Sequence, residues 1–115
     1  MIEKIIDKTF HMKKTIEQRN LEIDYEDKLT MSQYLKKNLR DLGLSSPASA
    51  QLMFSHQIIT LSDLVSNKIE NLVSIQPDQL HEIVEFVSIH GLKFGMDISL
   101  YTDEAVQAAY QRAYN

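Results

Sequence analysis

The chain of 115 residues contains only three glycines and two prolines. Because these residues interrupt helices most strongly, most of the chain is free to be helical. Apolar residues recur at helical spacing between the few breaks, most clearly in QPDQLHEIVEFVSIHG, where Leu80, Ile83, Val84 and Val87 are expected to form one buried stripe. Pro77 marks the start of this helix and Gly91 its end. No segment has the pattern of a strand, so the sequence predicts an all-α fold built from short helices.

Short polar residues ahead of apolar stripes predict where two further helices begin. Ser45 or Ser46 is expected to cap one of them, with Pro47 in its first turn. Thr60 and Asp63 have the Thr-x-x-Asp spacing of a capping box, which predicts a second short helix. After them, NKIENLVSI predicts another short helix.

The first 41 residues are predicted to form two helices. One runs from Ile2 to about Glu22, and the acidic stretch EIDYED, residues 22–27, separates it from the next. The second begins near Thr30 or Ser32. Its apolar positions at helical spacing are Met31, Tyr34, Leu35, Leu39 and Leu42.

The last segment, TDEAVQAAYQRAY, has a Thr/Asp cap and acids in its first turn, which predict a C-terminal helix. We therefore divide the chain into an N-terminal helical extension (1–41), a helical domain (42–98) and a C-terminal helix (99–115) packed on that domain. Two arrangements of residues 1–41 stay open from the sequence, a separate helical hairpin and a part of one common core. One face of the last helix is rich in tyrosine and alanine. We expect this face to pack on the core of the domain, and a homodimer contact through it is the alternative.

Charge is divided unequally along the chain, whose net charge is −4. Residues 1–42 carry nine basic and eight acidic side chains, whereas residues 43–115 carry three basic and eight acidic ones. The second part should therefore repel polyanions. The absence of cysteine excludes disulfides and thiolate metal sites and fits a cytoplasmic protein. No apolar run has the length of a membrane span, and the N-terminus lacks the pattern of a secretory signal.

No pattern predicts catalysis or a cofactor. The chain lacks a Gly-rich phosphate loop, an elbow-type serine and a cysteine nucleophile, so we expect it not to be an enzyme. The four histidines are His11, His56, His81 and His90. Only His81 shares a helix face with an acid one turn away, Glu85, and we interpret this pair as exposed surface rather than as a metal site.

The order of segments from Leu42 to Met96 resembles the C-terminal domain of the bacterial RNA polymerase α subunit. The resemblance runs through LGLS, ITLSDLV, IENLVSI, LHEIVEFV and HGLKFGM, and it covers about half of the chain. It implies a compact bundle of short helices that contains a helix-hairpin-helix-like element. The extra helices predicted at both ends, in residues 1–41 and after Tyr101, lie outside the resemblance. It also implies a bacterial or phage setting in transcription, where that family binds the DNA minor groove and docks onto σ factors and regulators.

The residues that contact DNA in this family are replaced in this chain. Where the family has an Arg and an Asn on its first helix, this chain has Pro47 or Ala48, and Ala50 or Gln51. In SIQPDQL the glycine of the hairpin is absent, and an Asp and a Gln stand where a Lys and a Ser would lie. The resemblance therefore implies the fold and contacts with proteins, and we do not expect DNA binding in the family's mode.

These observations predict a non-enzymatic protein-interaction module that docks to RNA polymerase, a σ factor or a transcription regulator. The expected partner-binding surface joins the first helix of the domain to the start of its last helix. Its residues are Ser46, Ser49, Gln51, Gln76, Asp78, Gln79 and Glu82.

Two alternatives stay open from the sequence. The basic residues Lys36, Lys37 and Arg40 on the N-terminal helices could bind DNA. The fold could instead serve a generic helical adaptor unrelated to transcription, because small helical domains occur in many settings.

Overall fold

The computed structural model describes residues 15–115, and within them the regular secondary structure is helical, with no strand. The helices are α2 (Ile16–Leu35), α3 (Ser46–His56), α4 (Leu61–Val65), α5 (Pro77–Ile89) and α6 (Asp103–Tyr114), with two short 3-10 helices, η1 (Ile69–Asn71) and η2 (Ile98–Tyr101). The predicted all-α fold is confirmed. Most of the helix expected from Ile2 lies outside the described residues.

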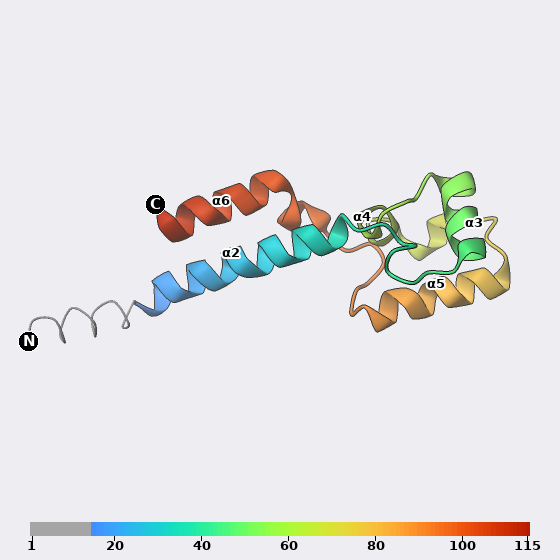
Figure 1. The fold of residues 1–115 in the computed structure, drawn as a ribbon, viewed down its shortest axis with the longest axis horizontal. Coiled ribbons are helices and arrows are strands. Elements are labelled where there is room, and N and C mark those ends of the chain that lie inside the picture. Colours follow the sequence, from blue (N-terminus) through green and yellow to red (C-terminus); the bar gives the residue numbers. More distant parts are fainter. Residues whose placement is uncertain (1–14) are drawn as a thin grey trace, which may run out of the picture.

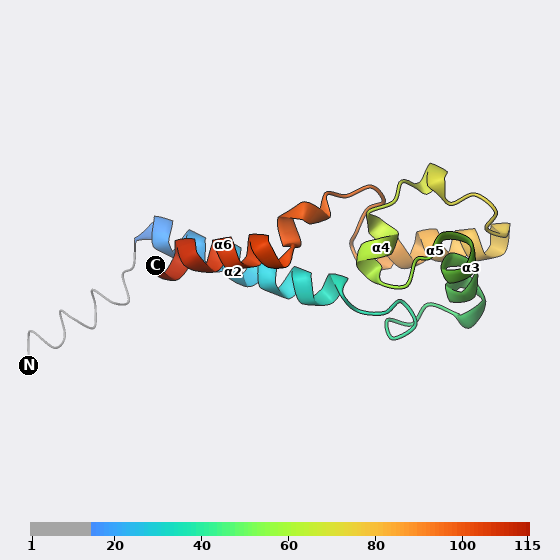
Figure 2. The ribbon, with the colours of Figure 1, turned by 90° about the horizontal axis from the view of Figure 1, so that it is seen from above.

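The described chain has two parts. Helices α2 and α6 lie side by side and antiparallel, forming a stalk (Figure 1). Residues 36–97, which include α3, α4 and α5, form a head at one end of this stalk. The view from above shows the same arrangement, with α6 lying along α2 and the head beyond them (Figure 2).

Helix α2 is one continuous helix of 20 residues, so the break predicted at residues 22–27 is wrong. Its N-terminus is capped by Thr15, whose side chain accepts a hydrogen bond from the backbone nitrogen of Gln18 at 3.1 Å. Glu26 and Asp27 are exposed, so the helix carries their charges without burying them. Local polarity therefore did not interrupt the helix.

Helix α2 ends at Leu35, before Leu39 and Leu42, whose spacing predicts that they continue it. Tertiary pairing explains the early end, because the backbone nitrogen of Leu39 donates to the carbonyl of Ile59 at 3.0 Å. The nitrogen of Leu61 in turn donates to the carbonyl of Lys37, also at 3.0 Å. These bonds hold residues 37–39 against the start of α4.

Several predicted helix ends are confirmed. Ser45 caps α3, and its side chain accepts a hydrogen bond from the nitrogen of Ala48. Thr60 and Asp63 form both bonds of a capping box at the start of α4. The helix expected in NKIENLVSI is reduced to the three residues of η1.

HGLKFGM ends α5 as a Schellman motif. The nitrogen of Leu92 donates to the carbonyl of Val87 at 3.1 Å, and that of Gly91 donates to the carbonyl of Ser88 at 2.9 Å. Gly91 has a φ of 71°, which a residue with a side chain adopts only at a cost. The chain then returns to α4, where the nitrogen of Met96 donates to the carbonyl of Val65 at 3.1 Å.

The core of the head is formed by apolar side chains from α3, α4, α5 and the loops between them. Leu35 and Leu39 belong to the same cluster, so the core includes residues from the segment predicted to be an N-terminal extension. The large side chains that are almost completely buried are Leu39, Leu52, Leu61, Leu64, Val65 and Ile83. The start of the head therefore lies near residue 36 rather than at residue 42.

Helix α6 packs along α2 rather than on the domain formed by residues 42–98, so its predicted position is wrong. Ala109 and Ala113 are buried there, and their small side chains allow the two helices to approach closely. The ring of Tyr25 on α2 meets those of Tyr110 and Tyr114 edge to face, with centroids 5.3 and 5.9 Å apart. On the face considered for a homodimer, α2 of the same chain thus covers the two alanines, whereas Tyr110 and Tyr114 contact α2 and remain 43% and 47% exposed.

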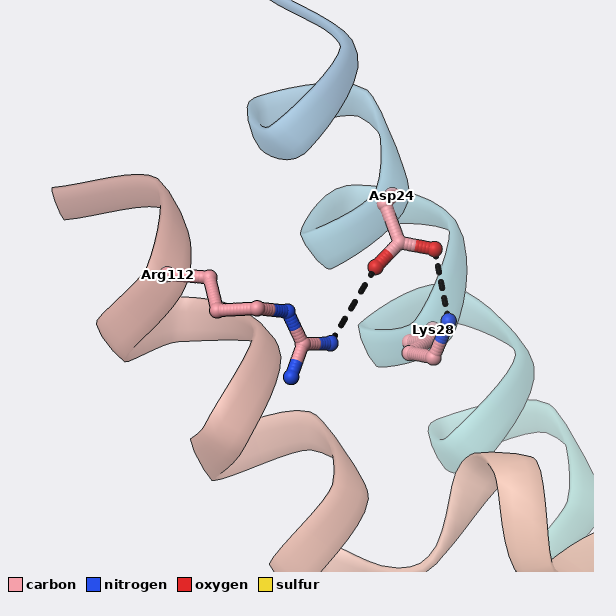
Figure 3. A network of polar contacts seen from close by, with 3 residues as sticks. All are labelled: Asp24, Lys28 and Arg112. Atoms are coloured by element: carbon pink, nitrogen blue, oxygen red, sulfur yellow. Dashed lines mark hydrogen bonds and ion pairs between the residues drawn. The ribbon is translucent and has the colours of Figure 1, made fainter. Parts of the chain in front are cut away.

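A polar network also joins the two helices of the stalk (Figure 3). The ammonium nitrogen of Lys28 lies 2.6 Å from one carboxylate oxygen of Asp24, and the guanidinium of Arg112 on α6 lies 3.6 Å from the other. The hydrogen bond from Lys28, with weaker attraction from both cations, lowers the pKa of Asp24 below its ordinary value.

Candidate functional site

Much of the predicted partner-binding surface is used inside the head to join α3 to α5. The side-chain oxygen of Gln51 accepts a hydrogen bond from the nitrogen of Gln76 at 2.8 Å, and its amide nitrogen donates to Gln79 at 3.1 Å. The carboxylate of Glu82 accepts two bonds from Ser45. These predicted contact residues therefore position α3 within the fold.

The other three predicted residues differ in their surroundings. Asp78 is exposed in the first turn of α5, where its charge is favourable near the helix N-terminus. Ser46 and Ser49 both line a groove that the sequence did not reveal. This groove, not the junction of α3 and α5, is the candidate site.

The α3 groove lies between α3 and the two segments 38–40 and 58–59. It encloses a volume of about 350 Å³. Its lining residues are Asn38, Leu39, Arg40, Ser46, Ser49, Ala50, Met53, Phe54, Ile58 and Ile59. The pairing of residues 37–39 with residues 59–61 fixes the wall opposite α3.

The groove has a buried apolar base and an exposed apolar rim. Leu39 and Ile58 are buried and belong to the core, so the base is rigid. At the rim, 80% of Phe54 is exposed, together with 46% of Ile59 and 41% of Met53. Apolar side chains gathered beside a groove are typical of a surface that another molecule covers.

Ser49 is the most deeply buried polar residue of the groove. It is only 8% exposed, and its hydroxyl has no hydrogen-bond partner within residues 15–115. A buried hydroxyl without a partner costs about 1–3 kcal/mol, so such groups are usually satisfied. The hydroxyl of Ser49 therefore stands out as a covered polar atom at the groove that lacks a partner in the described chain.

Arg40 is the one charged side chain of the groove lining. It is exposed, and none of the ion pairs found within residues 15–115 includes its guanidinium. Its backbone is fixed, because its nitrogen donates to the side-chain oxygen of Asn38 at 3.1 Å. The groove thus combines an apolar base and rim, one cation and one unpartnered hydroxyl.

The sequence pattern did not single out Phe54, because the buried stripe of α3 does not include it. Ala48 and Leu52 face the core, and Phe54 is two positions beyond Leu52. Two positions correspond to a rotation of about 200° around a helix, so Phe54 points away from the core. A large apolar residue outside the stripe was the signal that could have revealed the groove.

The basic residues of the DNA-binding alternative have three different surroundings. Lys36 forms an ion pair with Asp103 on α6, with 2.6 Å between nitrogen and oxygen. The ammonium of Lys37 lies 5.9 Å from the centre of the Tyr34 ring, and Arg40 lines the α3 groove. One of the three charges is therefore already paired within the chain.

A second hollow lies where the stalk meets the head. Its lining residues are Asp27, Thr30, Met31, Tyr34, His90, Leu92 and Tyr101, around a volume of about 460 Å³. Within it the hydroxyl of Tyr34 is hydrogen-bonded to Nδ1 of His90. This bond joins α2 to the end of α5, which makes the hollow part of the junction between stalk and head.

No metal site is found among residues 15–115, where no group of three potential ligands comes together. On the exposed side of α5, Nε2 of His81 lies 3.3 Å from Oε1 of Glu85. His11 lies outside the described residues. None of the helices in residues 15–115 combines the length and apolar character needed to cross a bilayer.

Comparison with known proteins adds no family to this description. No family model, curated protein or solved structure matches the chain.

Proposed function

We propose that the chain is a non-enzymatic docking module that binds a component of the transcription machinery through the α3 groove. The component is RNA polymerase, a σ factor or a transcription regulator. The observation that carries the docking proposal is the exposure of Phe54, at 80%, beside a groove with a rigid apolar base.

Phe54 has the properties of an interface anchor. Aromatic and methionine side chains are enriched in protein interfaces, and Met53 lies next to it on the same rim. Burying an exposed Phe side chain contributes about 1.5–3 kcal/mol, which is a large share of the energy that a few central residues supply in many complexes. The groove volume accommodates a few side chains, so it suits a short inserted segment.

The association with transcription is supported by the resemblance of residues 42–96 to the C-terminal domain of the polymerase α subunit. In that family, the domain docks onto σ factors and regulators and also binds DNA. The acidic balance of residues 43–115 favours protein partners over DNA.

Binding measurements with matched variants test the proposal. The full chain is immobilised, and purified bacterial RNA polymerase, its principal σ factor and a transcription regulator are passed over it in turn. Phe54→Ser is compared with Ile89→Ser, because both residues are 80% exposed and Ile89 lies on α5, outside the α3 groove.

We expect one of these proteins to bind, with affinity that falls at least about tenfold in Phe54→Ser and stays unchanged in Ile89→Ser. Absence of binding by all of them would overturn the transcription part of the proposal. Equal affinity of both variants would overturn the assignment of the α3 groove.

A further inference from the structure

The chemistry of the α3 groove restricts what can enter it. Arg40 is fixed by its backbone at the edge of the groove, and no acid is present in the lining. Asp63, close to the wall formed by Ile59, is already used, because its carboxylate accepts bonds from the nitrogens of Ile59 and Thr60. An incoming carboxylate would therefore meet a guanidinium without an ion pair in the described chain, and this group binds carboxylates through two parallel hydrogen bonds.

Ser49 adds a second polar requirement. Its hydroxyl can donate one hydrogen bond and accept others, and it has no partner within the described residues. A purely apolar occupant would leave this hydroxyl buried and unsatisfied. Because the hydroxyl oxygen is covered in the structure, a backbone group of a peptide satisfies it only if a neighbouring side chain moves as the peptide enters the groove.

From these two features and the apolar rim, we infer that the α3 groove binds an acidic, apolar peptide segment of another protein. An apolar side chain of the segment packs against Phe54, a neighbouring carboxylate binds Arg40, and a backbone polar group bonds to Ser49. This inference rests on the proposed docking function and adds the chemical class of the partner segment.

Other occupants fit the groove less well. Residues 1–14 of the same chain carry four lysines against two acids. Their net charge is positive, so it does not complement the positive charge of Arg40. The described chain also begins at the end of the stalk opposite the head (Figure 1). A lysine-rich partner or nucleic acid would lack either the carboxylate or the apolar side chain that the groove accommodates.

The test uses the full chain, labelled with nitrogen-15, and two short peptides. The acidic peptide alternates leucine and phenylalanine with aspartate, and the matched peptide replaces each aspartate with asparagine. We expect the acidic peptide to shift the amide signals of residues 38–40 and of α3, and to bind at least about tenfold more tightly than the neutral one.

Variants assign the three contacts. Arg40→Glu should weaken binding of the acidic peptide at least about tenfold and abolish the preference for it over the neutral peptide. Ser49→Ala should weaken binding of both peptides about fivefold while leaving the protein at least as resistant to urea, because it removes an unsatisfied hydroxyl. Lys93→Glu, a charge reversal outside the groove lining, is the control. It should change neither the binding of the two peptides nor the resistance of the protein to urea.

Equal binding of both peptides, or signal shifts confined to another face, would overturn the inference. So would amide shifts at α3 that depend on protein concentration without peptide, because they would identify a second copy as the occupant. If a polymerase component binds in a way that depends on Phe54 but is unaffected by Arg40→Glu, the inference about the acidic segment is wrong and the proposed docking function stands. If the acidic peptide binds selectively but no polymerase component binds, only the proposed transcription partner is wrong.

Discussion

The carboxylate of Glu82 accepts two hydrogen bonds from Ser45, one from its backbone nitrogen at 2.9 Å and one from its hydroxyl at 2.7 Å. Ser45 caps α3, so this contact fixes the start of that helix against α5. Ser46 and Ser49 follow in the first turns of α3 and line the groove. The relation between Glu82 and Ser45 therefore helps to set the geometry of the candidate site.

Replacing Glu82 with alanine should destabilise the head. The change removes both hydrogen bonds to Ser45, and bonds to a charged group contribute about 1.5–3 kcal/mol. We expect the free energy of unfolding, measured with urea, to fall by about that amount. Glu85→Ala is the control, because Glu85 is exposed and pairs only weakly with His81, and it should cost less than about 0.5 kcal/mol. Similar losses in the two variants would contradict this role of Glu82.

Replacing Gly91 should reveal the cost of its backbone conformation. No atom lies within 4 Å of the position that a Cβ would occupy, so the φ of 71° is the main obstacle to a side chain. Gly91→Val should lower the free energy of unfolding by about 1–2 kcal/mol, and Gly91→Asn should cost less because asparagine tolerates this conformation. Equal urea midpoints for the two variants would contradict this explanation.

The carboxyl of Asp24 should titrate below the ordinary aspartate range, and its pKa should depend mainly on Lys28. The hydrogen bond from Lys28 is the largest cause of the lowered pKa, so Lys28→Met should raise it more than Arg112→Met. Titration of the carboxyl carbon signal by NMR measures this order. A larger effect from Arg112→Met would contradict it.

The same carboxyl contributes to stability in a defined pH range. Because its pKa is lowered by folding, the contribution is complete above the unfolded value of about 3.9 and is lost as the pH falls through the folded value. The side chain is 40% exposed, so solvent screening limits the contribution to below about 0.5 kcal/mol. Asp24→Asn should therefore be slightly less stable than the parent chain at neutral pH and equal to it in strong acid.

Substitutions at Leu52 and Phe54, two positions apart on α3, should distinguish a residue that stabilises the fold from one that binds a partner. Leu52 is completely buried, and Leu52→Ala should lower the free energy of unfolding by about 2–5 kcal/mol. Phe54→Ser should change it by less than about 0.5 kcal/mol, since Phe54 projects into solvent. Urea unfolding measures both values, and a large loss in Phe54→Ser would indicate that this residue supports the fold instead of a partner contact.

A fluorescence anisotropy titration with an AT-rich duplex separates the docking function from the DNA-binding alternative. We expect no micromolar binding at about 50 mM salt, because the chain is acidic overall and Lys36 is paired with Asp103. Binding that weakens steeply towards about 200 mM salt, and that disappears on charge reversal of Lys36, Lys37 and Arg40, would favour the alternative.

Local patterns along the chain were enough to predict the helical class, the starts of α3 to α6 and the end of α5. Thr60 with Asp63, Pro77 and Gly91 act within one or two turns of their own positions, so their patterns could be interpreted without knowing the fold. The predicted stripe of Leu80, Ile83, Val84 and Val87 also reports a local property, the face of one helix that is turned inward. Val84 is the exception, because 37% of it is exposed.

Contacts between distant segments set where α2 ends, where α6 packs and which surface of α3 is open. Leu39 has helical spacing from Leu35, yet its backbone pairs with Ile59, and this pairing redirects the chain. Gln51 and Glu82 looked available for a partner, but each is used by residues at least 25 positions away. Such contacts compete with local preference, and a pattern along the chain does not record them.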